Sequence, residues 1–148
     1  MELELKDILG PGGLVAERLE GYEPRQEQIE MAEAVAAAFE DSEHLLVEAG
    51  TGVGKSFAYL IPAVLQAAGE DRRVVVSTCT IALQEQLISK DLPFLHEALP
   101  VEFSAALGKG RSNYVCFRRL AHAFKGRQQL FATTDLAEQL ERLGEWAM

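Results

Sequence analysis

The sequence predicts an α/β domain in which helices flank a parallel sheet. Two observations indicate this class: short apolar runs of strand type alternate with longer helical stretches, and a glycine-rich turn joins one such run to the next helix. The chain has 148 residues, 48% hydrophobic and 25% charged, which is ordinary for a soluble protein. We therefore expect one globular domain, or part of one, with a modest core.

The first half of the chain predicts two short amphipathic pieces around a Gly-Pro-Gly-Gly turn, and then a longer helix. The spacing of its apolar residues, which would bury one side, predicts this helix. It is expected to have Pro24 in its first turn and to end near Asp41. An apolar run over residues 44–50 predicts a strand buried on both faces. The run over residues 57–68 predicts a buried helix bent at Pro62.

The second half repeats this alternation before it becomes purely helical. Residues 72–80 have the same strand pattern, residues 81–92 are of helical type until Pro93 interrupts them, and residues 101–107 predict a third strand. From residue 117 onward the pattern is helical only. The three predicted strands would belong to one parallel sheet.

The segment EAGTGVGKSF, residues 48–57, has the composition of a phosphate-binding loop. Its glycines let the backbone wrap around an anion, and the start of the next helix directs N–H groups at it. Lys55 can reach the β- and γ-phosphates, and Ser56 can ligate magnesium. The strict pattern has glycine where this chain has Ala49, and a glycine-rich turn without phosphate remains the alternative. The predicted nucleotide-binding residues are Ala49, Gly50, Thr51, Gly52, Val53, Gly54, Lys55 and Ser56, of which Lys55 and Ser56 are the predicted catalytic residues.

Charge is segregated along the chain, whose net charge is -9. Residues 1–48 hold thirteen acidic and three basic side chains, whereas residues 103–134 hold six basic side chains and no acidic one. An acidic protein is a poor general binder of nucleic acid, but a local basic surface can contact phosphates. The alternative is a solvated helix face.

The sequence has neither a leader peptide pattern nor an apolar run long enough to span a bilayer, so we expect a cytoplasmic protein without a membrane partner. Its two cysteines, Cys79 and Cys116, are expected to be reduced thiols.

Four motifs of this chain resemble those of superfamily 2 helicases and occur in the same order. One is the phosphate-binding loop, which has the form A-x-T-G-x-G-K-S. The upstream stretch GYEPRQEQIEM is similar to the motif in which a glutamine, here Gln28, contacts adenine, with Arg25 nearby. The stretch VVVSTCTIALQEQLISKDLP resembles motif Ia of the DinG branch, which is related to XPD. That resemblance implies contacts with single-stranded DNA from Thr78, Thr80 and Gln84.

The fourth motif, KGRSNYVCFRRL, resembles the segment in which the DinG branch supplies the first cysteine ligand of a 4Fe-4S cluster. The resemblance implies that Cys116 is one ligand of four and that Lys109 and Arg111 face DNA. No later cysteine is present in this sequence. The alternatives are that Cys116 is a buried small hydrophobe, or that the protein belongs to a branch without a cluster.

The resemblance as a whole implies an incomplete RecA-like P-loop motor domain over residues 1–112 and the helical start of an iron-sulfur insertion over residues 113–148. The parent would be a monomeric, magnesium- and ATP-dependent helicase that moves 5′ to 3′ on single-stranded or forked DNA. The chain alone is expected to be inactive, because it has no Asp-Glu dipeptide of the helicase type to hold magnesium and orient water. A P-loop phosphotransferase and a noncatalytic nucleotide- or DNA-binding module remain the other interpretations.

Overall fold

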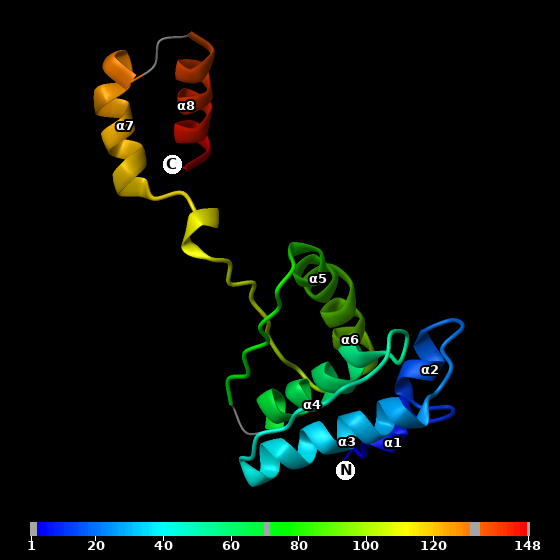
Figure 1. The fold of residues 1–148 in the computed structure, drawn as a ribbon. Coiled ribbons are helices and arrows are strands. Elements are labelled where there is room, and N and C mark those ends of the chain that lie inside the picture. Colours follow the sequence, from blue (N-terminus) through cyan, green and yellow to red (C-terminus); the bar gives the residue numbers. More distant parts are fainter. Residues whose placement is uncertain (1–2, 70–71, 131–133, 148) are drawn as a thin grey trace. The chain divides into compact units, whose positions relative to one another are not determined.

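The computed structural model describes residues 3–69, 72–130 and 134–147, and the chain divides into two compact units (Figure 1). The first unit comprises Met1–Leu107 and the second comprises Gly108–Met148. The predicted boundary after residue 112 therefore lies inside the second unit. That the second unit begins an iron-sulfur insertion stays a prediction.

The chain opens with two short helices, α1 (Leu5–Leu9) and α2 (Leu14–Arg18), which confirm the predicted amphipathic pieces. The glycine-rich turn between them begins where the Gly10 N–H donates to the Lys6 carbonyl oxygen over 2.9 Å. Ile8 and Leu9 of α1 are fully buried in the core of the first unit. The opening segment is therefore an integral part of the fold.

Two long helices, α3 (Gln26–Asp41) and α4 (Lys55–Gly69), lie side by side in the first unit (Figure 1). Ile29 and Ala32 of α3 are buried in the same cluster as Ala58 and Ile61 of α4. Complete burial of a side chain such as Ile61 contributes about 1.5–3 kcal/mol. Both helices were predicted, and α4 continues through the buried Pro62. The placement of Pro24 in the first turn is wrong, because α3 begins at Gln26 and Pro24 lies before its capping residue.

The next helical region runs without a break from Ile81 to Ala98 and contains a π-helical turn. It consists of α5 (Ile81–Gln86), the π-helix η1 (Leu87–Asp91) and α6 (Leu92–Ala98). The predicted interruption at Pro93 is wrong, because the helix continues through this proline, which follows directly after the π-helical turn. The extra residue is accommodated just before it: the Leu92 N–H donates to the Leu87 carbonyl, five residues earlier.

The three predicted strands are wrong for the part of the chain that the structure describes, which contains no β-strand. Residues 44–50, 72–80 and 101–107 are non-helical there and join no ladder. Leu46 is consequently 98% exposed and Val75 83% exposed. An apolar run indicates that a segment can be buried in a sheet. A strand forms only where a neighbouring backbone supplies its hydrogen bonds.

The second unit is helical, as predicted for residues 117 onward. A 3₁₀ turn, η2 (Arg111–Asn113), precedes α7 (Phe117–Leu130) and α8 (Thr134–Ala147). The last two helices touch closely, since a Cβ at Gly144 would lie 2.3 Å from the ring of Phe124. Across the described residues of both units, no helix is long and apolar enough to cross a membrane.

Candidate nucleotide-binding site

The predicted phosphate-binding loop lies immediately before α4, the helix that begins at Lys55. Two of its glycines have left-handed backbone angles, with φ of 86° at Gly52 and 82° at Gly54. Residues with a Cβ adopt this conformation at a cost, so glycine suits both positions. The loop therefore turns the chain sharply into the N-terminal end of a 15-residue helix, where backbone N–H groups favour an anion.

Gly54 also allows a close approach by a side chain from α3. A Cβ at position 54 would lie 2.2 Å from Gln28 Nε2, a distance that neither atom can tolerate. Gln28 Nε2 instead donates to the Gly54 carbonyl oxygen over 2.9 Å. The same carbonyl accepts the Ala58 N–H over 3.3 Å, the first hydrogen bond of α4. Gln28 thus holds the loop where it becomes helix.

Lys55 places its ammonium group inside the loop. Its Nζ donates to the Ala49 carbonyl oxygen over 3.0 Å and to the Gly50 carbonyl oxygen over 2.5 Å. Both acceptors are backbone carbonyl groups of the loop, so the Lys55 ammonium lies within the predicted phosphate-binding loop. This geometry joins the predicted catalytic lysine to two of the predicted loop residues.

Ser56 is half-buried in the first turn of α4 and is linked to Tyr59 one turn later. Burial raises the pKa of the Tyr59 hydroxyl, a hydrogen bond with the Ser56 side chain opposes that rise, and the charge of Asp91 adds to it. The tyrosine therefore stays protonated at neutral pH and serves as a polar partner of Ser56. Sequence reasoning missed Tyr59, although its spacing of three residues from Ser56 places it on the same face of a helix.

Arg25 lies at the start of α3 and reaches the middle of the loop. It occupies the position just before the helix, and its guanidinium Nη1 donates to the Gly52 carbonyl oxygen. Its Nη2 also lies 3.9 Å from Glu23 Oε2, an exposed pair that contributes little to stability. Arg25 and Gln28 thus approach successive glycines of the loop from one helix. Contact of either with a nucleotide base stays a prediction.

Tyr22 is a second residue that sequence reasoning missed. Its hydroxyl lies 2.7 Å from Gln28 Oε1 and 2.9 Å from the Leu9 carbonyl oxygen. Burial raises the pKa of this hydroxyl, and the nearby Arg25 charge partly offsets the rise, so it is a donor at neutral pH. The signal was present as the tyrosine of GYEP, six residues before Gln28, but a separation of six residues does not by itself indicate contact.

The predicted DNA-contacting residues of the first unit surround the start of α5. The Thr80 hydroxyl caps this helix by accepting the Leu83 N–H over 3.3 Å, and the Thr78 hydroxyl donates to the Thr80 carbonyl oxygen over 3.2 Å. Gln84 is half-buried in the same helix. The hydroxyl groups therefore have structural roles here, and contact with DNA stays a prediction.

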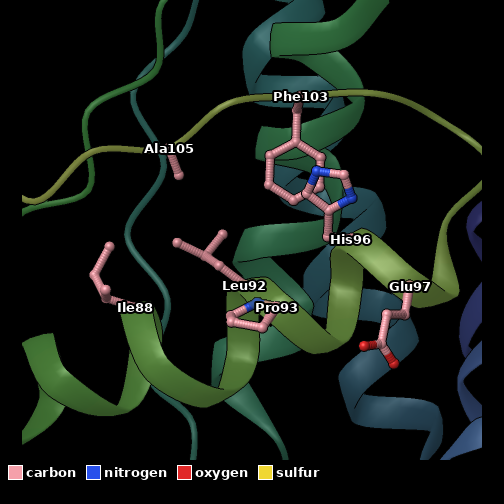
Figure 2. A pocket seen from close by; sticks show the side chains of 7 residues that line it. All are labelled: Ile88, Leu92, Pro93, His96, Glu97, Phe103 and Ala105. Carbon is pink, nitrogen blue, oxygen red and sulfur yellow. The ribbon is translucent and has the colours of Figure 1, made fainter.

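Residues of η1 and α6, with Phe103 and Ala105, line an open pocket of about 520 Å³ (Figure 2). The His96 and Phe103 rings face each other there, with centroids 5.1 Å apart. Within the described residues, no three His, Cys, Asp or Glu side chains gather as a metal site.

The second unit carries the other predicted residues on a short exposed loop. The Lys109 N–H donates to the Tyr114 hydroxyl oxygen over 2.7 Å, and the Asn113 N–H donates to the Gly110 carbonyl oxygen over 2.8 Å. Lys109 and Arg111 are exposed. Their side chains are therefore accessible, whereas the backbone between them is held by local bonds.

Cys116 lies just before α7 and is exposed, so the alternative of a buried thiol is wrong. Its carbonyl oxygen accepts the Leu120 N–H over 2.9 Å, which identifies it as the residue that caps the helix. The backbone N–H of Arg119 lowers the pKa of the Cys116 thiol, partial desolvation opposes this, and the N–H and charge of Arg118 act with Arg119. The thiolate is the form that binds metals, so this donor suits an iron-sulfur ligand.

The loop and its surroundings lie in a region of the chain that matches a known protein family. The DEAD/DEAH box helicase family matches residues 26–143. This range begins at α3 and includes the phosphate-binding loop, α5, α6 and most of the second unit. The chain therefore belongs to the DEAD/DEAH box helicase family, whose P-loop NTPase fold agrees with the predicted class.

Several individual proteins are similar to this chain and indicate its branch within the helicase family. The chain is 47% identical to the ATP-dependent helicase DinG of Mycobacterium tuberculosis H37Rv, over 83% of this chain and 21% of that protein. It is 45% identical to the ATP-dependent DNA helicase YoaA of Escherichia coli K12, over 92% of this chain and 20% of that protein. It is 41% identical to the 3'-5' exonuclease DinG of Bacillus subtilis, over 73% of this chain and 12% of that protein. The chain thus spans about a fifth of its helicase relatives, and the resemblance to the DinG branch is confirmed.

Proposed function

We propose that this chain is the nucleotide-binding part of the first motor domain of an ATP-dependent DNA helicase. The observation that carries the proposal is the position of the Lys55 ammonium inside a glycine turn at the N-terminal end of α4. A lysine and a glycine-rich turn at a helix N-terminus, where backbone N–H groups are free to donate, are the features that bind a nucleoside triphosphate. The 47% identity to a helicase named as ATP-dependent supports the choice of ATP.

In this proposal, Lys55 and Ser56 exchange protein partners for ligand atoms when ATP and magnesium bind. The Lys55 Nζ leaves the carbonyl groups of Ala49 and Gly50 for β- and γ-phosphate oxygens. The Ser56 hydroxyl, now paired with Tyr59, becomes a magnesium ligand. Magnesium prefers hard oxygen donors, and a serine hydroxyl beside phosphate oxygens meets that preference.

The parent protein would use this ATP to move 5′ to 3′ along single-stranded or forked DNA. Thr78, Thr80 and Gln84 would contact the strand from the first unit, and Lys109 and Arg111 from the second. The exposure of both basic side chains supports this role. Such contacts hold the DNA backbone and do not read its sequence.

Cys116 is proposed as one ligand of a 4Fe-4S cluster in the parent protein. Its exposure, its place at the start of α7 and its lowered pKa support a thiolate ligand. A cubane cluster takes four such ligands, and this chain has only one other cysteine, in motif Ia. The other ligands would therefore come from outside these 148 residues.

The test is an equilibrium titration of the chain with a fluorescent ATP analogue and magnesium, comparing Lys55→Ala with Lys6→Ala. Lys6 is a matched surface lysine, paired with Glu33 over 3.3 Å far from the loop in sequence. We expect micromolar to millimolar binding by the wild-type chain and by Lys6→Ala. Lys55→Ala should lose at least about 100-fold, since it removes the charge-assisted hydrogen bonds to the phosphate oxygens.

Phosphate release measured in the same samples tests the second half of the proposal. The chain has no Asp-Glu pair, so we expect binding without turnover. Equal affinity of Lys55→Ala and wild type, or ATP turnover that survives Lys55→Ala, would sink the assignment.

A further inference from the structure

Two aromatic side chains of the second unit are exposed beside the loop that carries Lys109 and Arg111. Tyr114 is 55% exposed and Phe117 is 66% exposed. Tyr114 directly follows the 3₁₀ turn η2, and Phe117 is the first residue of α7. Burial of a large aromatic ring is strongly favourable, so two such rings in solvent, three residues apart, mark a surface that can bind a ligand.

Hydrogen bonds hold Tyr114 in place although solvent surrounds much of its ring. Its hydroxyl oxygen accepts the Lys109 N–H over 2.7 Å, and its own N–H donates to the Arg111 carbonyl oxygen over 3.3 Å. The Asn113 side chain closes the same turn by donating to the Gly110 carbonyl oxygen over 3.2 Å. A ring that is fixed in advance loses little conformational entropy when a ligand binds, so the turn preorganises an exposed aromatic face.

The side chains that flank these rings in the sequence are basic. Lys109, Arg111, Arg118 and Arg119 are all exposed, and residues 103–134 contain no Asp or Glu. A nucleic acid strand offers phosphates to such basic groups and base faces to the rings. A protein segment would need acidic side chains to match the charge. The composition therefore favours a nucleic acid as the ligand of this surface.

We propose that Tyr114 and Phe117 form a stacking platform for unpaired bases of single-stranded DNA, while the neighbouring basic side chains bind its phosphates. The inference rests on the proposed DNA contacts of Lys109 and Arg111. It adds a contact with the DNA bases themselves. The Cα atoms of the two aromatic residues can be at most about 10 Å apart across three residues, so one short stretch of strand can reach both rings.

The stacking platform distinguishes single-stranded from duplex DNA without reading sequence. Every base has a π face, so any of the four bases can stack on an aromatic ring. In a duplex these faces are already stacked on neighbouring bases, and taking a base out of the stack costs free energy. Phosphates are present in both forms. The rings therefore supply a preference for unpaired strands that contacts from Lys109 and Arg111 alone cannot supply.

The experiment measures the affinity of this chain for three labelled oligonucleotides of equal length by fluorescence anisotropy: a thymidylate strand, an abasic strand and a duplex. The abasic strand keeps the phosphates and has no base, so its affinity reports the basic side chains alone. Tyr114→Leu with Phe117→Leu should weaken binding of the thymidylate strand by at least about tenfold, because each stacked base contributes about a five- to 100-fold gain in affinity. Affinities for the abasic strand and the duplex should not change.

The salt dependence separates the rings from the basic side chains. The double leucine variant should keep the wild-type slope, since it loses no phosphate contact. Lys109→Ala with Arg111→Ala should instead weaken all three oligonucleotides and make the slope shallower. Tyr114→Phe keeps the ring and removes the hydroxyl that accepts from Lys109, so it should lose less affinity for the thymidylate strand than Tyr114→Leu.

Trp146→Leu is the matched control. It removes a ring that is 73% exposed in the same unit but lies next to Glu145, away in sequence from the basic segment. Its affinities for all three oligonucleotides should equal those of the wild type. ATP affinity should be unchanged in every variant, because Lys55 belongs to the first unit.

The outcomes separate this inference from the proposed function. If the double leucine variant binds the thymidylate strand as tightly as the wild type does, the rings do not stack on bases, and contact with another protein segment becomes their role. An equal loss for the abasic strand, or an equal loss in Trp146→Leu, overturns the inference as well. In these cases the phosphate contacts stand if the double alanine variant weakens binding. If the wild type binds none of the three oligonucleotides, the proposed DNA contacts of the second unit fail together with the inference.

Discussion

The phosphate-binding loop and the basic loop around Cys116 are held in place in different ways. Around the first, Arg25 and Gln28 reach Gly52 and Gly54 across more than twenty residues of sequence. Around the second, hydrogen bonds join Lys109 to Tyr114 and Gly110 to Asn113, all within a few residues. The first loop therefore depends on the fold of its unit, whereas the second depends on its own local turns.

The largest difference should appear when a methyl group is added to a glycine in each loop. Gly54→Ala combines a φ of 82° with a Cβ 2.2 Å from Gln28 Nε2. We expect about 1–3 kcal/mol of lost stability and at least a tenfold loss of nucleotide affinity. The measurements are chemical denaturation and titration with ATP.

Gly108→Ala is the matched substitution in the basic loop, because a Cβ there meets nothing within 4 Å. It should change stability by less than about 0.5 kcal/mol and leave nucleotide affinity unchanged. Equal effects of the two alanine variants would contradict the distinction between the loops.

An iron measurement tests what holds the second loop in the parent protein. In full-length protein purified without oxygen, Cys116→Ser should remove the iron and the brown absorbance, because one thiolate ligand is removed. ATP binding should persist, since the phosphate-binding loop takes its support from α3. Cys79→Ser is the control and should retain the iron. Parent protein that holds no iron after reconstitution with iron and sulfide would refute the cluster.

The smallest expected effect is on the affinity of the parent protein for single-stranded DNA. Lys109→Ala with Arg111→Ala should weaken binding and make its salt dependence shallower, by about one unit of slope for each phosphate that is no longer neutralised. Lys6→Ala with Arg18→Ala removes the same charge from the acidic part of the first unit and should leave the slope unchanged. Indistinguishable slopes in the two double variants would exclude a phosphate-contacting role for the basic loop.

The helices and the loop could be predicted from sequence because their signals are local. Apolar spacing identified α3 and α4, and three glycines followed by Lys55 and Ser56 identified the turn between an apolar run and a helix. Tyr22 and Tyr59 were missed, because their roles depend on which side chains the fold brings to them.

The prediction of three strands was wrong because it, too, depended on contacts between distant parts of the chain. The apolar run that contains Leu46 has the composition of a buried strand, yet its hydrogen-bonding partner is a matter of tertiary structure. Pro93 shows the converse case, in which a residue that usually ends a helix lies where the helix tolerates it.

The π-turn at Leu87–Asp91 changes which sequence positions share a helix face. The wider turn accommodates one extra residue, so the positions after it are shifted by one residue relative to the α-helical spacing of about 3.6 residues per turn. The buried Leu95 and Ala98 of α6 consequently need not continue the apolar stripe of α5. A deletion of one residue here would restore a regular helix and leave Leu95 facing the core. Alignments of this region should therefore be anchored separately on each side of the π-turn.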